Sequence, residues 1–206
     1  MVPFVCFTGR PGAHVGGATA HPDLDWGPVF RRAPQYVVEE EHRDWSSAAG
    51  CTAMLRTRNY IEDSVHPLHA AGLLRFISPD AMLSKHVRAV PAAGHTPGNL
   101  CVRVEGSAAT VTLAGDAMHH GVQILDPGLS TQYCVQPLEA ARVRKTLLGQ
   151  AAEDGSILLP THFPMPSAGR VKQSSPGLSF QCATDLAMPG QFMVNKWRTA
   201  MKEQSA

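Results

Sequence analysis

The sequence predicts an α/β fold in a single domain that spans residues 1–206. Short apolar runs rich in β-branched and aromatic residues alternate with longer segments of helical periodicity, which is the pattern of α/β proteins. The length suits one domain with its own core, and no repeat, low-complexity tract or linker divides the chain. Hydrophobic residues make up 44% of the chain and charged residues 17%, so the composition is that of a globular protein.

Charge and hydropathy exclude two classes of partner. The formal net charge is +1 and no basic stripe is present, so neither nucleic acid nor an anionic membrane is the expected partner. No apolar run approaches the roughly 20 residues of a membrane span, and no charged segment precedes the apolar residues at the N-terminus. We therefore expect a cytoplasmic protein that acts on a small molecule.

The five cysteines predict neither a zinc knuckle nor a thioredoxin-like site, because their number is odd and no pair has Cys-x-x-Cys spacing. Cys6 and Cys101 lie within strand-like apolar runs, where a free cysteine behaves as a small hydrophobic residue. We expect these two thiols to be buried and structural.

Short apolar runs followed by glycine or proline predict the strands. They are residues 3–8, 35–38, 73–77, 86–90, 100–104, 110–114 and 157–159. The runs at 100–104 and 110–114 are separated by a Glu-Gly-Ser turn and predict a hairpin. Residues 9–32 are rich in glycine and proline and lack periodicity, so they predict a loop.

Four segments predict helices. Residues 39–45 begin with acids, which suits the positive end of a helix dipole. Residues 53–66 have apolar positions at helical spacing and are expected to stop at Pro67. Residues 137–152 begin with proline, as helices often do, and 191–202 carry apolar residues on one side. The expected apolar face of the third helix consists of Leu138, Ala141, Leu147 and Leu148.

Three potential metal ligands follow predicted strands. They are His95 within the Gly-His-Thr-Pro-Gly sequence of residues 94–98, Asp116 directly after Gly115, and His162 directly after Thr161. A strand followed at once by glycine or proline presents the next side chains at the rim of a sheet. We therefore expect the three ligands to form one site, and histidine nitrogen with carboxylate oxygen suits zinc.

The order and spacing of these motifs resemble the metallo-β-lactamase superfamily over residues 4–170. The sequences Gly-Asp-Ala-Met-His-His at 115–120 and Thr-His-Phe-Pro at 161–164 are similar to its lactonase-like branch, which includes the N-acyl homoserine lactonases and related esterases. The resemblance implies a four-layer αβ/βα sandwich with one or two metal ions, usually zinc, at the rim of the sheets. Such an ion lowers the pKa of a bound water toward ~7 and makes it a nucleophile.

The resemblance also assigns roles to residues. His95 is implied as a ligand of the first metal site and His162 as a ligand of the second. Asp116 is implied as the bridge between the two sites and as the catalytic carboxylate.

The sequence departs from the family at its main ligand motif, His-x-His-x-Asp-His, which should follow the first strand. Here the two leading histidines correspond to Gly9 and Pro11 and the aspartate to Ala13, none of which has a side chain that binds metal. Only His14 remains of the motif. The first site is thereby reduced to His95 and the bridging Asp116.

The second site keeps three expected ligands, His14, Asp116 and His162. Three ligands with an open position suffice for a catalytic zinc, so we expect at most one zinc ion. Because the aspartate replaced by Ala13 assists proton transfer in the family, hydrolysis would need another base. The available candidates are His119, His120, His21, Asp23 and Asp25.

The expected function is hydrolysis of an ester, a lactone or a thioester with at most one metal. Two alternatives stay open at this point: a non-hydrolytic member that binds a ligand without metal or runs a cyclisation, isomerisation or elimination, and a structural subunit. The ligand motif lies well inside the chain in the family but follows a strand that begins at Pro3 here, so an N-terminally shortened fold is expected. A second copy, a partner chain or a different start site would each account for the sheet that is then left exposed.

Overall fold

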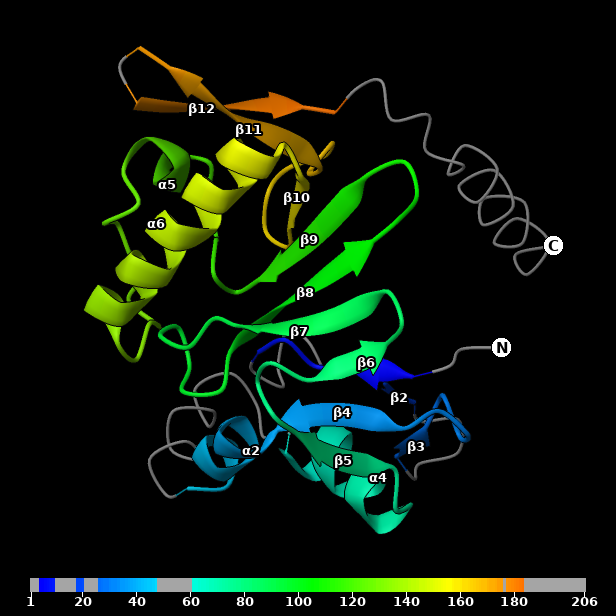
Figure 1. The fold of residues 1–206 in the computed structure, drawn as a ribbon. Coiled ribbons are helices and arrows are strands. Elements are labelled where there is room, and N and C mark those ends of the chain that lie inside the picture. Colours follow the sequence, from blue (N-terminus) through cyan, green and yellow to red (C-terminus); the bar gives the residue numbers. More distant parts are fainter. Residues whose placement is uncertain (1–3, 10–17, 21–25, 48–60, 176, 184–206) are drawn as a thin grey trace, which may run out of the picture.

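The computed structural model describes residues 4–9, 18–20, 26–47, 61–175 and 177–183. Its larger sheet has the strand order β12-β11-β10-β9-β8-β7-β6 (Figure 1). Neighbouring strands are antiparallel except β9 and β10, which are parallel because the helix α6 connects them. The strands are β6 (Met82–Ser84), β7 (Val87–Pro91), β8 (Leu100–Glu105), β9 (Thr110–Gly115), β10 (Ile157–Pro160), β11 (Gly169–Ser174) and β12 (Gly177–Cys182), with α5 (Val122–Leu125) and α6 (Pro137–Asp154) between β9 and β10.

The smaller sheet has the order β1-β4-β5 in the described part, and both strand pairs are parallel. Its strands are β1 (Val5–Cys6), β4 (Gln35–Val38) and β5 (Leu74–Ile77). The helix α2 (Glu39–Ser46), the π-helix η1 (Ile61–Val65) and α4 (His66–Ala70) cover it, and a separate pair of short strands consists of β2 (Thr19–Ala20) and β3 (Gly27–Pro28).

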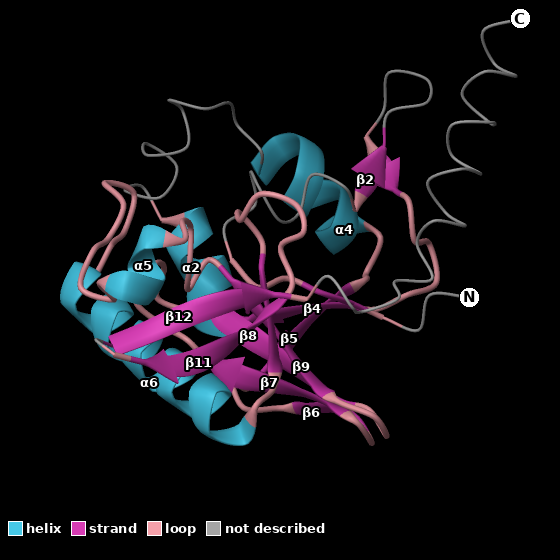
Figure 2. Cartoon of the chain, turned by 90° about the horizontal axis from the view of Figure 1, so that it is seen from above, coloured by secondary structure: helices cyan, strands magenta, loops and turns pink. Residues whose placement is uncertain are grey.

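The two sheets and their helices form four layers, with α6 beside the larger sheet and α2 and α4 beside the smaller one (Figure 1). Figure 2 shows α6 and α4 on opposite sides of the sheets. Alternation of side chains along each strand explains the layering. In β8, Cys101 packs with residues of α6, whereas Leu100 and Val102 face the smaller sheet. In β4, Val37 packs toward the helices and Val38 toward the larger sheet.

The two cysteines expected to be structural are held inside the fold. Cys101 is buried, Cys6 is half-buried, and burial raises the pKa of each thiol to about 12. Both thiols therefore stay protonated at neutral pH, as a structural role requires. Among the described residues, no helix combines the length and apolar character needed to cross a bilayer.

Most predicted elements are present. The predicted hairpin is β8 and β9, and the helices predicted at 39–45 and 137–152 are α2 and α6. The prediction that Pro67 stops a helix was wrong: Pro67 lies in the first turn of α4, where a missing N–H costs no hydrogen bond. The predicted loop at 9–32 contains β2 and β3, and β6, α5, β11 and β12 were not predicted. Residues 53–60 and the predicted helix at 191–202 lie outside the described residues. The expectation of a single domain stays a prediction.

The inner face of α6 agrees with the predicted one only in part. Leu147 and Leu148 are buried as predicted, but Leu138 is 88% exposed, and the inner face also contains Arg144, which is 2% exposed. Arg144 donates hydrogen bonds to the carbonyl oxygens of Ala117 (3.1 Å), Pro127 (3.0 Å) and Leu129 (2.9 Å). Burial lowers the pKa of Arg144, but an arginine remains charged. The side chain thus fixes the long connection that follows β9.

Replacement of Arg144 by leucine should lower the free energy of unfolding by about 3 kcal/mol, because buried carbonyl oxygens lose their donor. Urea denaturation of both proteins measures the loss. The matched control is Arg142→Leu on the same helix, where the arginine is exposed and pairs with Glu139. Equal losses in the two variants would contradict the assigned role.

Candidate metal centre

Three strand ends meet at one rim of the larger sheet. The parallel strands β9 and β10 end side by side, with Gly115 opposite Pro160. The antiparallel neighbour β8 begins at the same rim, so the 94–98 loop before it lies there too. The end of β1 joins them, because the amide of Leu100 donates to the carbonyl oxygen of Thr8 at 3.1 Å. Sheet topology therefore brings together residues that are far apart in the sequence.

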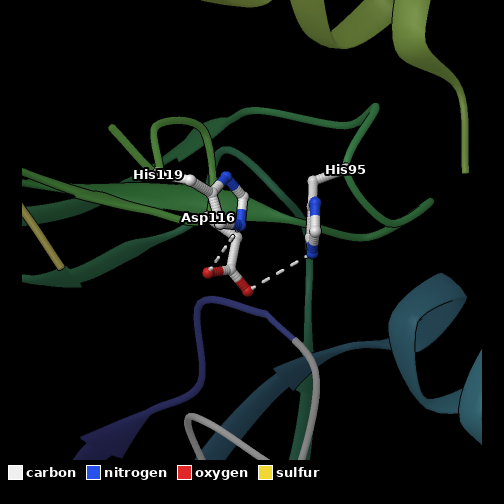
Figure 3. A group of neighbouring side chains, drawn as sticks. All are labelled: His95, Asp116 and His119. Carbon is white, nitrogen blue, oxygen red and sulfur yellow. Dashed lines mark ion pairs between the residues drawn. The ribbon is translucent and has the colours of Figure 1, made fainter. Parts of the chain in front are cut away.

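Asp116, directly after β9, has imidazoles on both sides of its carboxylate. It is 3% exposed. Its Oδ1 atom lies 2.8 Å from Nε2 of His162 and 3.6 Å from Nε2 of His119, and its Oδ2 atom lies 3.7 Å from Nε2 of His95. Figure 3 shows His95 and His119 pointing toward the carboxylate from different loops. Three imidazoles thus surround one buried carboxylate.

The three imidazoles also pack against one another. The ring of His119 stacks on that of His162 with centroids 4.9 Å apart and planes 6° apart, and lies 4.6 Å from that of His95. His95 is buried, while the side chains of His119 and His162 are 20% and 35% exposed. The cluster is therefore closed on the His95 side and open to solvent on the other.

This donor set fits a divalent metal ion. Nitrogen and oxygen atoms of His95, Asp116 and His119 all lie within 4.8 Å of one another. Two ligands on a tetrahedral zinc ion, with bonds of about 2.0–2.1 Å, lie roughly 3.3 Å apart. The separations of 3.6 and 3.7 Å from Asp116 to His119 and His95 are close to this value. Imidazole and carboxylate are also ligand types that zinc prefers. His162 lies outside this group of three, with its Nε2 atom at hydrogen-bond distance, 2.8 Å, from Oδ1 of Asp116.

Gly9, three residues after β1, lies directly against the carboxylate. A Cβ atom on Gly9 would lie 2.6 Å from Oδ2 of Asp116 and 3.1 Å from Oδ1 of Asn99. The resemblance places Gly9 where the family has its first metal-binding histidine. In this chain that place therefore provides no ligand, and a side chain there would displace Asp116.

The loop that carries His95 is fixed by a buried acid of α2. Glu41, which is 1% exposed, accepts hydrogen bonds from the amide of Gly98 (3.0 Å) and the indole of Trp45 (2.8 Å). A Cβ on Gly98 would lie 2.4 Å from the backbone nitrogen of Glu41, so only glycine permits this approach. Burial raises the pKa of Glu41, while its hydrogen bonds lower it less.

The turn that carries His119 is held by Gln123 in α5. Its Oε1 atom accepts hydrogen bonds from the amides of His119 (2.7 Å) and His120 (3.1 Å), and its Nε2 atom donates to Leu129. The Nδ1 atom of His120 accepts a hydrogen bond from the amide of Val122, so His120 caps this turn. The turn therefore presents His119 to Asp116.

The structure brings together three of the four predicted metal ligands, His95, Asp116 and His162. His14 lies outside the described residues, as do His21, Asp23 and Asp25. The sequence predicted His119 only as a candidate base, and its position as a potential metal ligand was not predicted. The signal was its position three residues after Asp116, in the turn that leaves β9.

No protein-family model matches the sequence, and no curated protein matches it. Solved structures share its fold at low identity. The hydrolase AbOPH of the β-lactamase superfamily has a TM-score of 0.76 at 20% identity, over 87% of this chain and 63% of its own. AidC, a dizinc quorum-quenching lactonase, has a TM-score of 0.70 at 20% identity, over 89% of this chain and 65% of its own. A probable metal-dependent hydrolase from Staphylococcus aureus has a TM-score of 0.73 at 13% identity, over 89% of this chain and 63% of its own.

These likenesses show that the chain has the metallo-β-lactamase fold, an αβ/βα sandwich of four layers, as the motif resemblance predicts. The chain spans less than two thirds of the length of these solved proteins.

A methyl group at position 9 should disturb the centre directly. Gly9→Ala would place a Cβ 2.6 Å from Oδ2 of Asp116, so the carboxylate must move. We expect a loss of about 1–3 kcal/mol in unfolding free energy, typical of overpacking, measured by chemical denaturation. The control is Gly121→Ala, which has nothing within 4 Å of its Cβ position. A Gly9→Ala protein as stable as this control would refute the close approach.

The buried Glu41 should make stability depend on pH. Because its folded pKa is raised, the ionised form is disfavoured, and stability is lost as the pH rises from the ordinary value of 4.5 through the raised value. Glu41→Gln cannot ionise, so its unfolding free energy should rise relative to that of the wild type across this window. Urea denaturation from about pH 4 to about pH 8 tests this. The exposed Glu39→Gln on the same helix is the control, and an equal effect there would contradict the prediction.

Proposed function

We propose that the protein is a metal-dependent hydrolase that opens an ester, a lactone or a thioester with a single bound ion. The observation that carries the proposal is the set of three imidazoles around the buried carboxylate of Asp116. His95, Asp116, His119 and His162 would hold the ion, and zinc is the expected metal. His14 remains a predicted further ligand.

The ion and the residues of the centre would have different roles in such a site. When bound, the ion supplies a Lewis acid that polarises a carbonyl oxygen and lowers the pKa of water. Asp116 provides the negative charge that retains a cation at the rim, and the stacked rings of His119 and His162 hold each other's orientation. Because these two side chains are partly exposed and His95 is buried, a substrate would approach from their side.

The solved neighbours support the reaction class. They include a hydrolase, a dizinc lactonase and an N-acyl homoserine lactone hydrolase. One ion is proposed here because Gly9, Pro11 and Ala13 offer no side-chain ligand at the positions of the family motif. The cytoplasmic location and the second copy or partner chain stay predictions.

Metal content and hydrolysis test the proposal together. Wild-type protein should retain about one equivalent of divalent metal by elemental analysis and should release acid from thioesters or lactones in a pH-stat assay. His162→Ala should weaken metal binding by roughly tenfold to a hundredfold or more and reduce hydrolysis in parallel, since a ligand is lost. The control is His66→Ala, because His66 is an exposed histidine of α4 that pairs with Glu62 and is not part of the cluster.

Two results would contradict the proposal. One is wild-type protein without metal whose melting temperature is unchanged by a chelator. The other is a metal-loaded protein that hydrolyses none of the three bond types.

A further inference from the structure

Asn99, the residue before β8, has a buried oxygen close to Gly9. The side chain is 1% exposed. Its Nδ2 atom donates to the carbonyl oxygen of Ala92 at 2.9 Å, which fixes the orientation of the carboxamide. The Oδ1 atom has no hydrogen-bond partner within the described part of the chain. A buried acceptor without a donor costs free energy, so we expect this oxygen to bind a ligand.

The unpartnered oxygen lies next to the carboxylate of Asp116. Oδ1 of Asn99 and Oδ2 of Asp116 lie 3.1 Å and 2.6 Å from the same point, the position of a Cβ on Gly9. Both oxygen atoms therefore border the space that a side chain on Gly9 would occupy. A buried amide oxygen without a hydrogen-bond partner, close to a carboxylate, forms an environment that favours a cation.

We propose that Asn99 is an oxygen ligand of the divalent ion, on the Oδ2 side of Asp116. His95 completes this side, since its Nε2 atom lies 3.7 Å from the same Oδ2. The proposal rests on the proposed function, in that an ion must bind at Asp116. It assigns a ligand that the motif resemblance does not contain. This ligand lies beside Gly9, the position at which the family motif has a histidine.

The donor set has a consequence for metal preference. With Asn99, the ligands of the proposed ion would be imidazoles, a carboxylate and a carboxamide, a set with more oxygen than the three histidines of the family's first site. Oxygen ligands suit manganese and magnesium, whereas imidazole suits zinc, copper and iron. The centre should therefore bind Mn²⁺ better relative to Zn²⁺ than a site of three histidines does.

Substitutions at position 99 separate a ligand from a structural residue. Asn99→Ala loses the oxygen and the bond to Ala92, whereas Asn99→Asp loses that bond but keeps a more strongly binding oxygen. The matched control is Gln35→Ala, because Gln35 is also buried, donates to a backbone carbonyl and has an unpartnered Oε1, but lies at the start of β4. Affinities for Zn²⁺ and Mn²⁺ are measured on metal-depleted protein by competition with a chromophoric chelator, and melting temperatures on the same samples.

All three variants should melt at lower temperature than the wild type without metal. Asn99→Ala should lose about tenfold or more in affinity, with a larger loss for Mn²⁺, while Asn99→Asp and Gln35→Ala should bind as tightly as the wild type or more tightly. If Asn99→Ala does not fold, the nearly isosteric Asn99→Leu provides the second test. It fills the same space without an oxygen atom and should weaken metal binding by as much as Asn99→Ala.

Three outcomes overturn the proposal. Asn99→Ala that binds both metals like the wild type shows that the oxygen is not a ligand. Asn99→Asp that loses as much affinity as Asn99→Ala shows that the Ala92 bond, and not the oxygen, matters. Wild-type protein that binds neither metal refutes the proposed function itself, and with it the role of Asn99.

Discussion

A carboxylate removed from water needs hydrogen-bond donors or positive charge around it, and Asp116 meets this need with imidazoles on both of its oxygen atoms. This requirement constrains the whole rim. The histidines lie before β8, after β9 and after β10, so they surround the carboxylate only if these three strands are neighbours with the observed directions. The parallel pairing of β9 with β10 through α6 is the feature on which this convergence depends.

Two buried ionisable side chains support the centre from opposite layers of the sandwich. Glu41 of α2 accepts the amide of Gly98 and so fixes the loop of His95. Arg144 of α6 bonds the carbonyl oxygens of the connection that follows Asp116. Burial disfavours the charged form of each, as the raised pKa of Glu41 and the lowered pKa of Arg144 show. Both helical layers thus use a costly buried group to hold one loop of the site.

The sequence predicts the parts of this protein that follow local rules. Strand ends marked by glycine and proline placed His95, Asp116 and His162 correctly at one rim. Features set by tertiary contacts were not predictable. Arg144 interrupts the apolar side of α6, and only the carbonyl groups of a distant loop explain its burial. His119 resembles any polar turn residue until the turn is folded against Asp116.

The glycine at position 9 determines how closely its neighbours approach. A histidine at position 9 would need room for its own Cβ, yet the Asp116 carboxylate and the Asn99 carboxamide approach that position to 2.6 Å and 3.1 Å. The observed packing of Asp116 and Asn99 therefore exists because residue 9 is glycine. The glycine at position 9, where the motif resemblance expects a histidine, and the close approach of an amide oxygen thus belong to one packing arrangement. Under the proposed function, Asn99 would supply a donor beside the position at which that histidine is absent.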